Sequence, residues 1–195
     1  MSKGFVLILS GPSGSGKDTV INELLKKDPD TMVSISMTTR KPRPGEVDGV
    51  HYYFVTKDAF EKAIRDGEML EYARYGDNYY GTPRGPLRAW TEAGKTVILK
   101  IEVQGAAKVK EQNPDIMMLF LMPPSIYALR KRLAGRNTES AEEIEERISI
   151  AKREIVGSYA YDYIIVNDRV EDAVNHILDL IRRHRRLLDT GAEAG

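Results

Sequence analysis

The chain has 195 residues, 42% of them hydrophobic and 30% charged, a balance typical of one folded domain and not of a disordered chain. Its 29 basic residues equal its 29 acidic ones, so the overall charge gives no argument for nucleic acid or a membrane surface as a partner. The absence of cysteine excludes disulfides, thiolate zinc sites and cysteine nucleophiles, and it suits a cytoplasmic location.

The first predicted element is a buried strand, because residues 5–9 (FVLIL) form a short apolar block. This block is too short for the core of a signal peptide, and no segment approaches the roughly 20 apolar residues that cross a bilayer. A glycine-rich loop follows, and the apolar spacing over 19–25 then predicts a helix. We therefore expect a strand, a loop and a helix in that order.

The glycine-rich loop (GPSGSGK) fits the Walker A spacing and lies in the context that this motif requires, between a buried strand and a helix. Backbone N–H groups in such a loop point at phosphate oxygens, and Lys17 places a cation on the phosphate that is transferred. The loop therefore predicts a nucleotide phosphate site, with an ordinary glycine-rich turn as the alternative. The predicted ATP-binding residues here are Gly11, Pro12, Ser13, Gly14, Ser15, Gly16, Lys17, Asp18 and Thr19.

The residue after the lysine departs from the motif. Walker A loops have Ser or Thr there to touch Mg²⁺, but this chain has Asp18, and the hydroxyl comes one place later at Thr19. Thr19 is therefore a candidate metal ligand. The loop alone does not distinguish a kinase from a GTPase, a motor ATPase or a sulfotransferase.

The stretch 34–94 differs in composition from the segments on either side and looks inserted between them. It is rich in Pro, Gly and Arg and then in Tyr, and it predicts a small α+β unit with strands at 34–38, 51–55 and 69–75 and a helix at 57–66. Within it, two arginines lie on a proline-stiffened segment (SMTTRKPRPGE), and guanidinium forks match phosphate oxygens. These arginines fit a monophosphate clamp or, equally well, a basic surface loop.

After the inserted stretch the alternation of strands and helices returns, which predicts the α/β class: a mostly parallel sheet between two layers of helices. The predicted strands are 97–101, 116–121 and 163–166, and the predicted helices are near 104–111, near 125–133 and within 170–188. The basic cluster 182–186 suits the C-terminal end of a helix better than a nucleic-acid site, and the three histidines lack the spacing of metal ligands.

Two further segments carry candidate functional residues. Glu102 ends a buried strand and resembles a Walker B acid, which holds Mg²⁺ or its water shell; a structural acid is the alternative. The segment 132–138 (RLAGRNT) breaks a helix at a glycine and leads into the acidic run 139–146 and then Arg147. Charge patterning alone also fits an ordinary solvated helix face.

In their order and spacing, the motifs GPSGSGK, SMTTRKPRPGEVDG, NYYGT, VQGA, RLAGRNTES and VND closely resemble those of guanylate kinases across nearly the whole chain. The resemblance implies ATP-dependent phosphorylation of GMP, and of dGMP, with Mg²⁺. It also implies one three-layer P-loop kinase domain: a core of about 1–33, 95–134 and 158–190, a small α+β GMP-binding insertion at about 34–94 and a helical lid at about 135–157.

The resemblance further implies which residues bind GMP. In the family pattern Ser36 and Thr82 contact the base, and a carboxylate at Glu71 accepts from guanine N1–H and N2–H₂, donors that adenine lacks. Taken alone, Glu71 would more often be a surface charge. The full implied GMP site consists of Ser36, Arg40, Arg43, Tyr52, Glu71, Tyr80, Thr82 and Glu102.

On the ATP side, the resemblance implies that Arg132, Arg136 and Arg147 reach the nucleotide phosphates or stack on adenine, and that Asn167 lies near the adenine. The implied catalytic residues are Lys17, Arg40, Arg132 and Arg147. The chain departs from the family pattern at Lys100, where an acid is common, and at Asn137, which replaces a glycine. The alternatives are a P-loop kinase for another small phosphate, and a catalytically inactive binding module, which intact Lys17 and both clamp arginines argue against.

Overall fold

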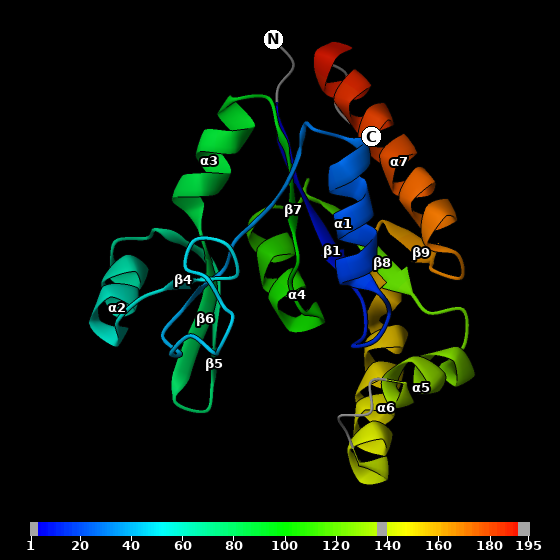
Figure 1. Ribbon diagram of the computed structural model, residues 1–195. Helices are drawn as coiled ribbons and strands as arrows, with labels where there is room; N and C mark the ends of the chain where they lie inside the picture. The colour runs from blue at the N-terminus through cyan, green and yellow to red at the C-terminus, as the bar shows by residue number, and fades with distance from the viewer. Residues whose placement is uncertain (1–3, 136–139, 191–195) are drawn as a thin grey trace.

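The computed structural model describes residues 4–135 and 140–190, and its centre is a five-stranded parallel sheet (Figure 1). The strands lie in the order β2 (Thr31–Val33), β7 (Thr96–Leu99), β1 (Phe5–Ser10), β8 (Met117–Met122) and β9 (Tyr163–Val166). All four pairings between neighbours are parallel. The glycine-rich loop therefore leaves the carboxyl end of the middle strand, which is where open α/β sheets bind ligands.

Helices cover both faces of this sheet, as the continuous apolar strands require. Helices α1 (Lys17–Lys27) and α7 (Val170–Thr190) cover one face, while α3 (Arg84–Glu92) and α4 (Val103–Gln112) cover the other (Figure 1). The pleat of β1 sends alternate side chains to the two cores: Leu7 and Leu9 pack with α1 and α7, and Ile8 packs with α4.

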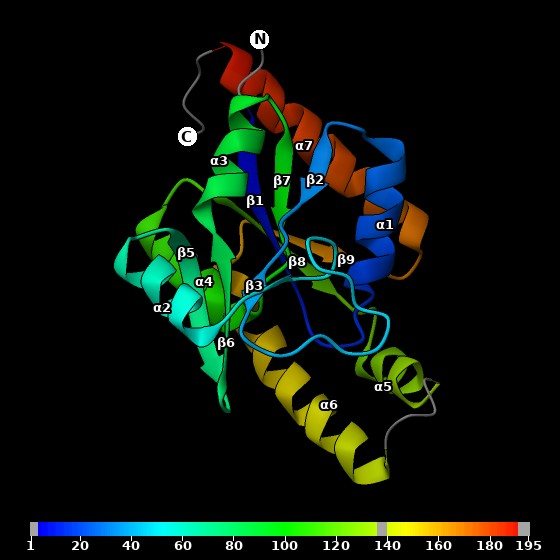
Figure 2. The same ribbon diagram turned by 60° about the vertical axis from the view of Figure 1, so that its left-hand side comes forward.

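A separate mixed sheet of four short strands lies beside the parallel one. It has the order β4 (Tyr53–Phe54), β3 (Met37–Thr38), β6 (Asn78–Pro83) and β5 (Met69–Tyr75), and helix α2 (Lys57–Arg65) packs on it. The rings of Phe60 on α2 and Tyr79 on β6 stack with their centroids 5.3 Å apart. In Figure 2 the long loop between β3 and β4 passes in front of the carboxyl ends of the parallel strands.

Two helices project below the parallel sheet: α5 (Ile126–Ala134) and α6 (Ala141–Val156) (Figures 1 and 2). Their facing sides form a small core of their own, made by Leu129, Leu133, Ile148 and Ala151. Helix α6 begins with a capping box, in which the Ser140 hydroxyl accepts from the Glu143 N–H and the Glu143 carboxylate accepts from the Ser140 N–H. A 3₁₀ turn (Gly157–Ala160) then leads into β9.

The predicted α/β class and three-layer arrangement are confirmed, and the predicted strand at 69–75 has the observed bounds. The predicted strand at 34–38 is wrong over most of its length, because only Met37–Thr38 pairs with β4 and β6, while Thr31–Val33 joins the parallel sheet instead. Strand β6 and helix α3 were not predicted. Among the described residues, no helix has the length and apolar character needed to cross a membrane.

Candidate active site

The loop between β1 and α1 has a backbone shape that requires glycine, most clearly at Gly16. Gly16, the residue before α1, has φ +94°, and a Cβ there would lie 2.5 Å from Nδ2 of Asn167. The Lys17 ammonium folds back and donates to the carbonyls of Gly11 and, at 3.1 Å, of Pro12. Burial lowers the pKa of Lys17. The loop is therefore compact, with its cation held against its own backbone.

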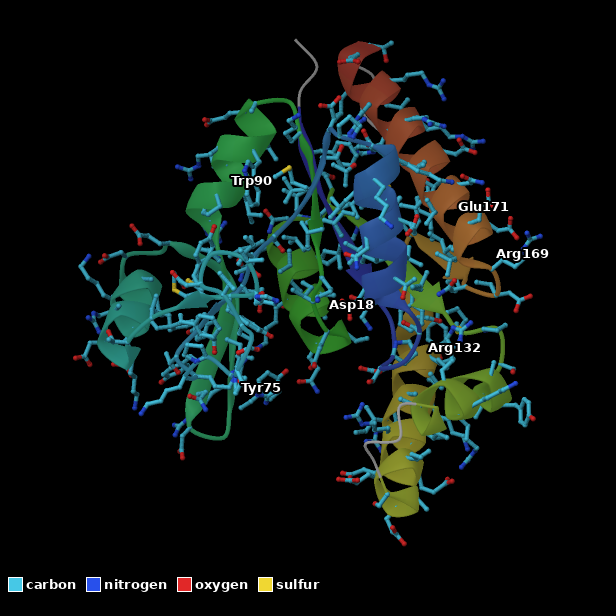
Figure 3. All side chains as sticks on the ribbon, in the orientation of Figure 1. Asp18, Tyr75, Trp90, Arg132, Arg169 and Glu171 are labelled. Atoms are coloured by element: carbon cyan, nitrogen blue, oxygen red, sulfur yellow. The ribbon has the colours of Figure 1, made fainter. Side chains whose placement is uncertain are left out.

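Two predicted ATP-site residues, Asn167 and Arg132, hold this loop in place through hydrogen bonds to backbone carbonyls. The buried Asn167 amide donates to the Ser15 carbonyl at 2.7 Å, and Arg132 on α5 donates to the Ser15 and Asn167 carbonyls at 3.3 and 2.8 Å. Figure 3 labels Arg132 beside the lower end of α1. These contacts join the start of α1, the end of β9 and helix α5 around the loop.

A cavity of about 560 Å³ opens in front of the loop, and we call it the donor cavity. Arg147 on α6 reaches across to it and donates to the Ser13 hydroxyl at 3.1 Å. Thr19 is exposed and does not line it, and Arg136 lies outside the described residues. The lining residues are Gly11, Ser13, Lys17, Asp18, Tyr52, Lys100, Ile101, Glu102, Arg147, Ile150 and Glu154.

A second cavity of about 350 Å³, the acceptor cavity, lies between the mixed sheet and α4. Glu71 and Thr82 face each other across β5 and β6, and the Thr82 hydroxyl donates to Glu71 Oε1 at 2.7 Å. Burial raises the pKa of Glu71, while the bond from Thr82 acts in the opposite direction. The predicted residues that line this cavity are Ser36, Tyr52, Glu71, Tyr80 and Glu102.

The predicted phosphate-clamp arginines differ in their surroundings. Arg40 is mostly buried, forms a two-pronged pair with Glu46 at 2.8 and 2.9 Å, and lies over the Tyr52 ring at 5.5 Å from its centroid. This pair lowers the pKa of Glu46 to about 2. The Arg43 side chain is exposed and lines neither cavity, but its N–H also donates to Glu46, at 2.7 Å.

The two cavities meet on a floor of four residues that belong to both: Tyr52, Lys100, Ile101 and Glu102. Each flank of this shared floor is tied down by a polar contact. The Tyr75 hydroxyl donates to Glu102 at 2.8 Å from the acceptor side, and Lys100 pairs with Asp18 at 2.9 Å on the donor side. Figure 3 shows Tyr75 on the β5–β6 hairpin and Asp18 at the start of α1.

The sequence motifs did not predict several residues that line these cavities, among them Tyr75, Lys108 and Glu154. They also did not predict Glu46, which lines neither cavity but pairs with Arg40. Tyr75 carried a usable signal, since it lies four residues after Glu71 on one strand and so shares its face. Glu154 gave none, because only the packing of α6 brings it near Lys17. Burial raises the pKa of Glu154, and the neighbouring Lys17 opposes this.

A family model described as guanylate kinase matches residues 3–184. The guanylate kinase of Oceanobacillus iheyensis is 51% identical over 180 residues, which are 92% of this chain and 87% of that protein. The guanylate kinase of Lactococcus lactis subsp. lactis is 49% identical over 187 residues, 96% of this chain and 91% of that protein.

A solved structure gives the same result at the level of the fold. The crystal structure of guanylate kinase from Anaplasma phagocytophilum superposes with a TM-score of 0.74 at 35% sequence identity, covering 95% of this chain and 88% of that one. Identity at this level over nearly the full length of both chains covers the parallel sheet, the mixed sheet and the projecting helices alike. The chain therefore belongs to the guanylate kinase family of enzymes.

Proposed function

We propose that this chain phosphorylates GMP to GDP with ATP at the shared floor, where GMP in the acceptor cavity meets ATP in the donor cavity. The observation that supports this placement is that Tyr52, Lys100, Ile101 and Glu102 line both cavities. Two substrates that react directly need their phosphates in line and in contact, and a common floor provides that alignment.

The guanine base is recognised through Glu71. Its carboxylate accepts from guanine N1–H and N2–H₂, and the Thr82 hydroxyl keeps one carboxylate oxygen in place by the 2.7 Å bond. Ser36 lines the same cavity and contacts the base. Adenine offers no matching donors, so the half-buried carboxylate would keep its bond from Thr82 but gain no partner from the base. We propose dGMP as a second substrate, because these contacts involve the base and not the sugar.

The GMP phosphate is held by Arg40 and Arg43 with the phenols of Tyr52 and Tyr80. Arg40 supports this role, because the pair with Glu46 and the Tyr52 ring fix its guanidinium before any ligand arrives. Arg43 shares the Glu46 carboxylate through its backbone, so the two arginines are positioned by one acid. We propose that residues 34–94 form the GMP-binding unit.

ATP phosphates are cradled by the backbone N–H groups of the Gly11–Gly16 loop, and Lys17 leaves its carbonyl partners for the transferred phosphate. Arg147, with Arg136 from outside the described residues, neutralises charge on that group, while Arg132 and Asn167 hold the loop. Residues 135–157 act as the lid that excludes water.

No protein nucleophile is needed for the transfer. An oxygen of the GMP phosphate attacks the terminal phosphorus of ATP, a new P–O bond forms, and the bond to the bridging oxygen of ADP breaks with its electron pair leaving on ADP. Lys17, Arg40, Arg132 and Arg147 contribute to this step by alignment and by charge.

The carboxylates of Asp18 and Glu102 line the donor cavity and fit Mg²⁺, which takes one or two protein carboxylates together with substrate phosphates and water. Bound there, Mg²⁺ would supply charge neutralisation at the phosphates. Thr19, the predicted hydroxyl ligand, is exposed and outside the cavity lining. We also propose a cytoplasmic location, where ATP and GMP are found.

The experiment that tests this function is an ATP-dependent phosphorylation assay with GMP, dGMP, AMP, CMP and UMP offered separately. We expect turnover of GMP and dGMP, and little with the other three. Turnover of AMP in place of GMP would contradict the proposed roles of Ser36, Glu71 and Thr82.

A further inference from the structure

Lys100 lies on the floor common to both cavities, although it belongs to neither the Walker A loop nor the arginine clamp. We propose that Lys100 binds phosphate oxygens of both nucleotides at once, and that Asp18 is its counter-ion when no nucleotide is bound. The inference rests on the proposed function and adds a substrate-binding residue to it.

The backbone places Lys100 firmly at this point. It directly follows Leu99, the last residue of β7, at the edge of the sheet where the carboxyl ends of the parallel strands meet. The next residue, Ile101, is anchored to the neighbouring strand, because the buried Ser10 hydroxyl donates to its carbonyl at 2.8 Å. The lysine stem therefore starts from a fixed position, and only its flexible side chain has to move.

A phosphate can readily replace Asp18 as the partner of Lys100. Its 2.9 Å contact lies between side chains that are 46% and 76% exposed, and an ion pair in such surroundings contributes little to stability. Asp18 also lies in the first turn of α1, where the positive end of the helix dipole stabilises its carboxylate when Lys100 moves away. A phosphate carries more negative charge than one carboxylate, so it competes well for the ammonium.

The charges around the shared floor explain why a cation is needed at Lys100. Without it, the part of the floor that both nucleotides share would present the carboxylate of Glu102 to two anionic phosphate groups. The lysine ammonium is compact and has three donors without a fixed fork, so it serves oxygens from two molecules more easily than a guanidinium. The charged residues that line the donor cavity within the described chain are Asp18, Glu102, Glu154, Lys17, Lys100 and Arg147.

The test uses P¹-(adenosine-5′)-P⁵-(guanosine-5′) pentaphosphate, a compound in which one phosphate chain joins the two nucleosides and so spans the floor. Its affinity is measured by calorimetry for the full chain in EDTA, so that no metal mediates the contact. We expect Lys100→Met to weaken binding about tenfold, the cost of about one charged hydrogen bond. Asp18→Asn should bind equally well or more tightly, because its lysine is freed.

Lys26→Met is the matched control, because Lys26 forms an exposed pair with Glu23 at 2.6 Å on the same helix as Asp18. It should bind like wild type, and thermal unfolding of all variants checks that each is folded. Unchanged affinity in Lys100→Met would overturn the proposal, and so would a loss in Asp18→Asn as large as in Lys100→Met. Wild-type turnover of GMP is assayed in parallel, so a failure of the proposed function is seen separately.

Discussion

Glu71 illustrates how single residues in this site combine opposing effects. Burial raises the pKa of its carboxyl group, which disfavours the charged form, yet the proposed recognition of guanine needs that charge as an acceptor. Thr82 offsets part of this cost by donating to the carboxylate at 2.7 Å. The Glu71 carboxylate is therefore suited to a ligand that has two N–H donors.

The substitution Glu71→Gln should separate the two substrates. It replaces an acceptor by an NH₂ donor that faces the guanine donors, at a cost of about 1–3 kcal/mol, and kcat/KM for GMP should fall about 5- to 150-fold. The affinity for ATP should stay the same. Steady-state kinetics and ATP titration measure both, with the exposed Glu68→Gln as control. Equal kinetics for Glu71→Gln and wild type would refute the assignment.

The raised pKa of Glu71 also predicts how activity depends on pH. As the pH falls through the pKa of the folded protein, the carboxylate is protonated and kcat/KM for GMP falls; above that pKa it reaches a plateau. Thr82→Val removes a bond that lowers this pKa, so the acidic limb of the profile should move to higher pH. Thr91→Val removes a hydroxyl that bonds within α3 and is the control. A limb that stays in place would contradict this role of Thr82.

Among the elements, strands with continuous apolar runs were predictable from the sequence. Of the strands with mixed composition, β5 was predicted and β6 was not. Strand β8 is buried on both faces, so its pattern is unambiguous. Strand β6 contains Gly81 and Pro83, and helix α3 has Gly85 and Pro86 in its first turn, residues that usually mark turns. Their structure depends on pairing with β5 and packing on the sheet, which no local pattern records.

The motifs of the proposed site could be recognised in the sequence, but the side-chain contacts between residues far apart in the chain could not. The Walker A loop was recognised from its residue spacing and the proposed GMP residues from the resemblance to the family, and the roles of these residues stay predictions. The pairs Asp18–Lys100 and Tyr75–Glu102 join residues 82 and 27 positions apart in the chain. Only the folded sheet, which brings the start of α1 and the β5 strand to the end of β7, makes them neighbours.

Asn167 links three elements, so its removal should lower both the free energy of unfolding and the affinity for ATP. Asn167→Ala deletes the 2.7 Å bond to the Ser15 carbonyl, to which Arg132 still donates, at a cost of about 1–3 kcal/mol in the free energy of unfolding. ATP affinity should fall with it, because the loop loses its brace. Urea unfolding and ATP titration measure the two effects.

The matched control for this prediction is Asn113→Ala. Asn113 also donates its amide to a backbone carbonyl, that of Val109 at 3.1 Å, but it lies at the far end of α4. It should lower stability without changing ATP affinity. If Asn167→Ala binds ATP as wild type does, Asn167 does not brace the loop.

On the scale of the whole molecule, the mixed sheet and the α5–α6 pair extend on either side of the floor (Figure 1). Arg147 reaches the donor cavity from one side and Tyr75 reaches Glu102 from the other. We expect both parts to approach the substrates together, because the proposed catalysis has to exclude water.

This closure is measurable by spin labels, because the chain has no native cysteine to interfere. Labels at Asp77→Cys, in the β5–β6 turn, and Glu146→Cys, on α6, should move closer by more than about 2 Å when the pentaphosphate compound binds. Labels at Glu111→Cys on α4 and Glu171→Cys on α7, two helices that cover the parallel sheet, form the control pair and should keep their distance. An unchanged distance between positions 77 and 146 would exclude closure.

The common floor has a thermodynamic consequence. Tyr52, Lys100, Ile101 and Glu102 line both proposed binding sites, so we expect the nucleotide that binds first to rearrange groups that the second one needs. Linkage then requires reciprocity: if bound GMP changes the dissociation constant of ATP by some factor, bound ATP must change that of GMP by the same factor. A substitution on this floor cannot alter one of these two cross-effects and spare the other.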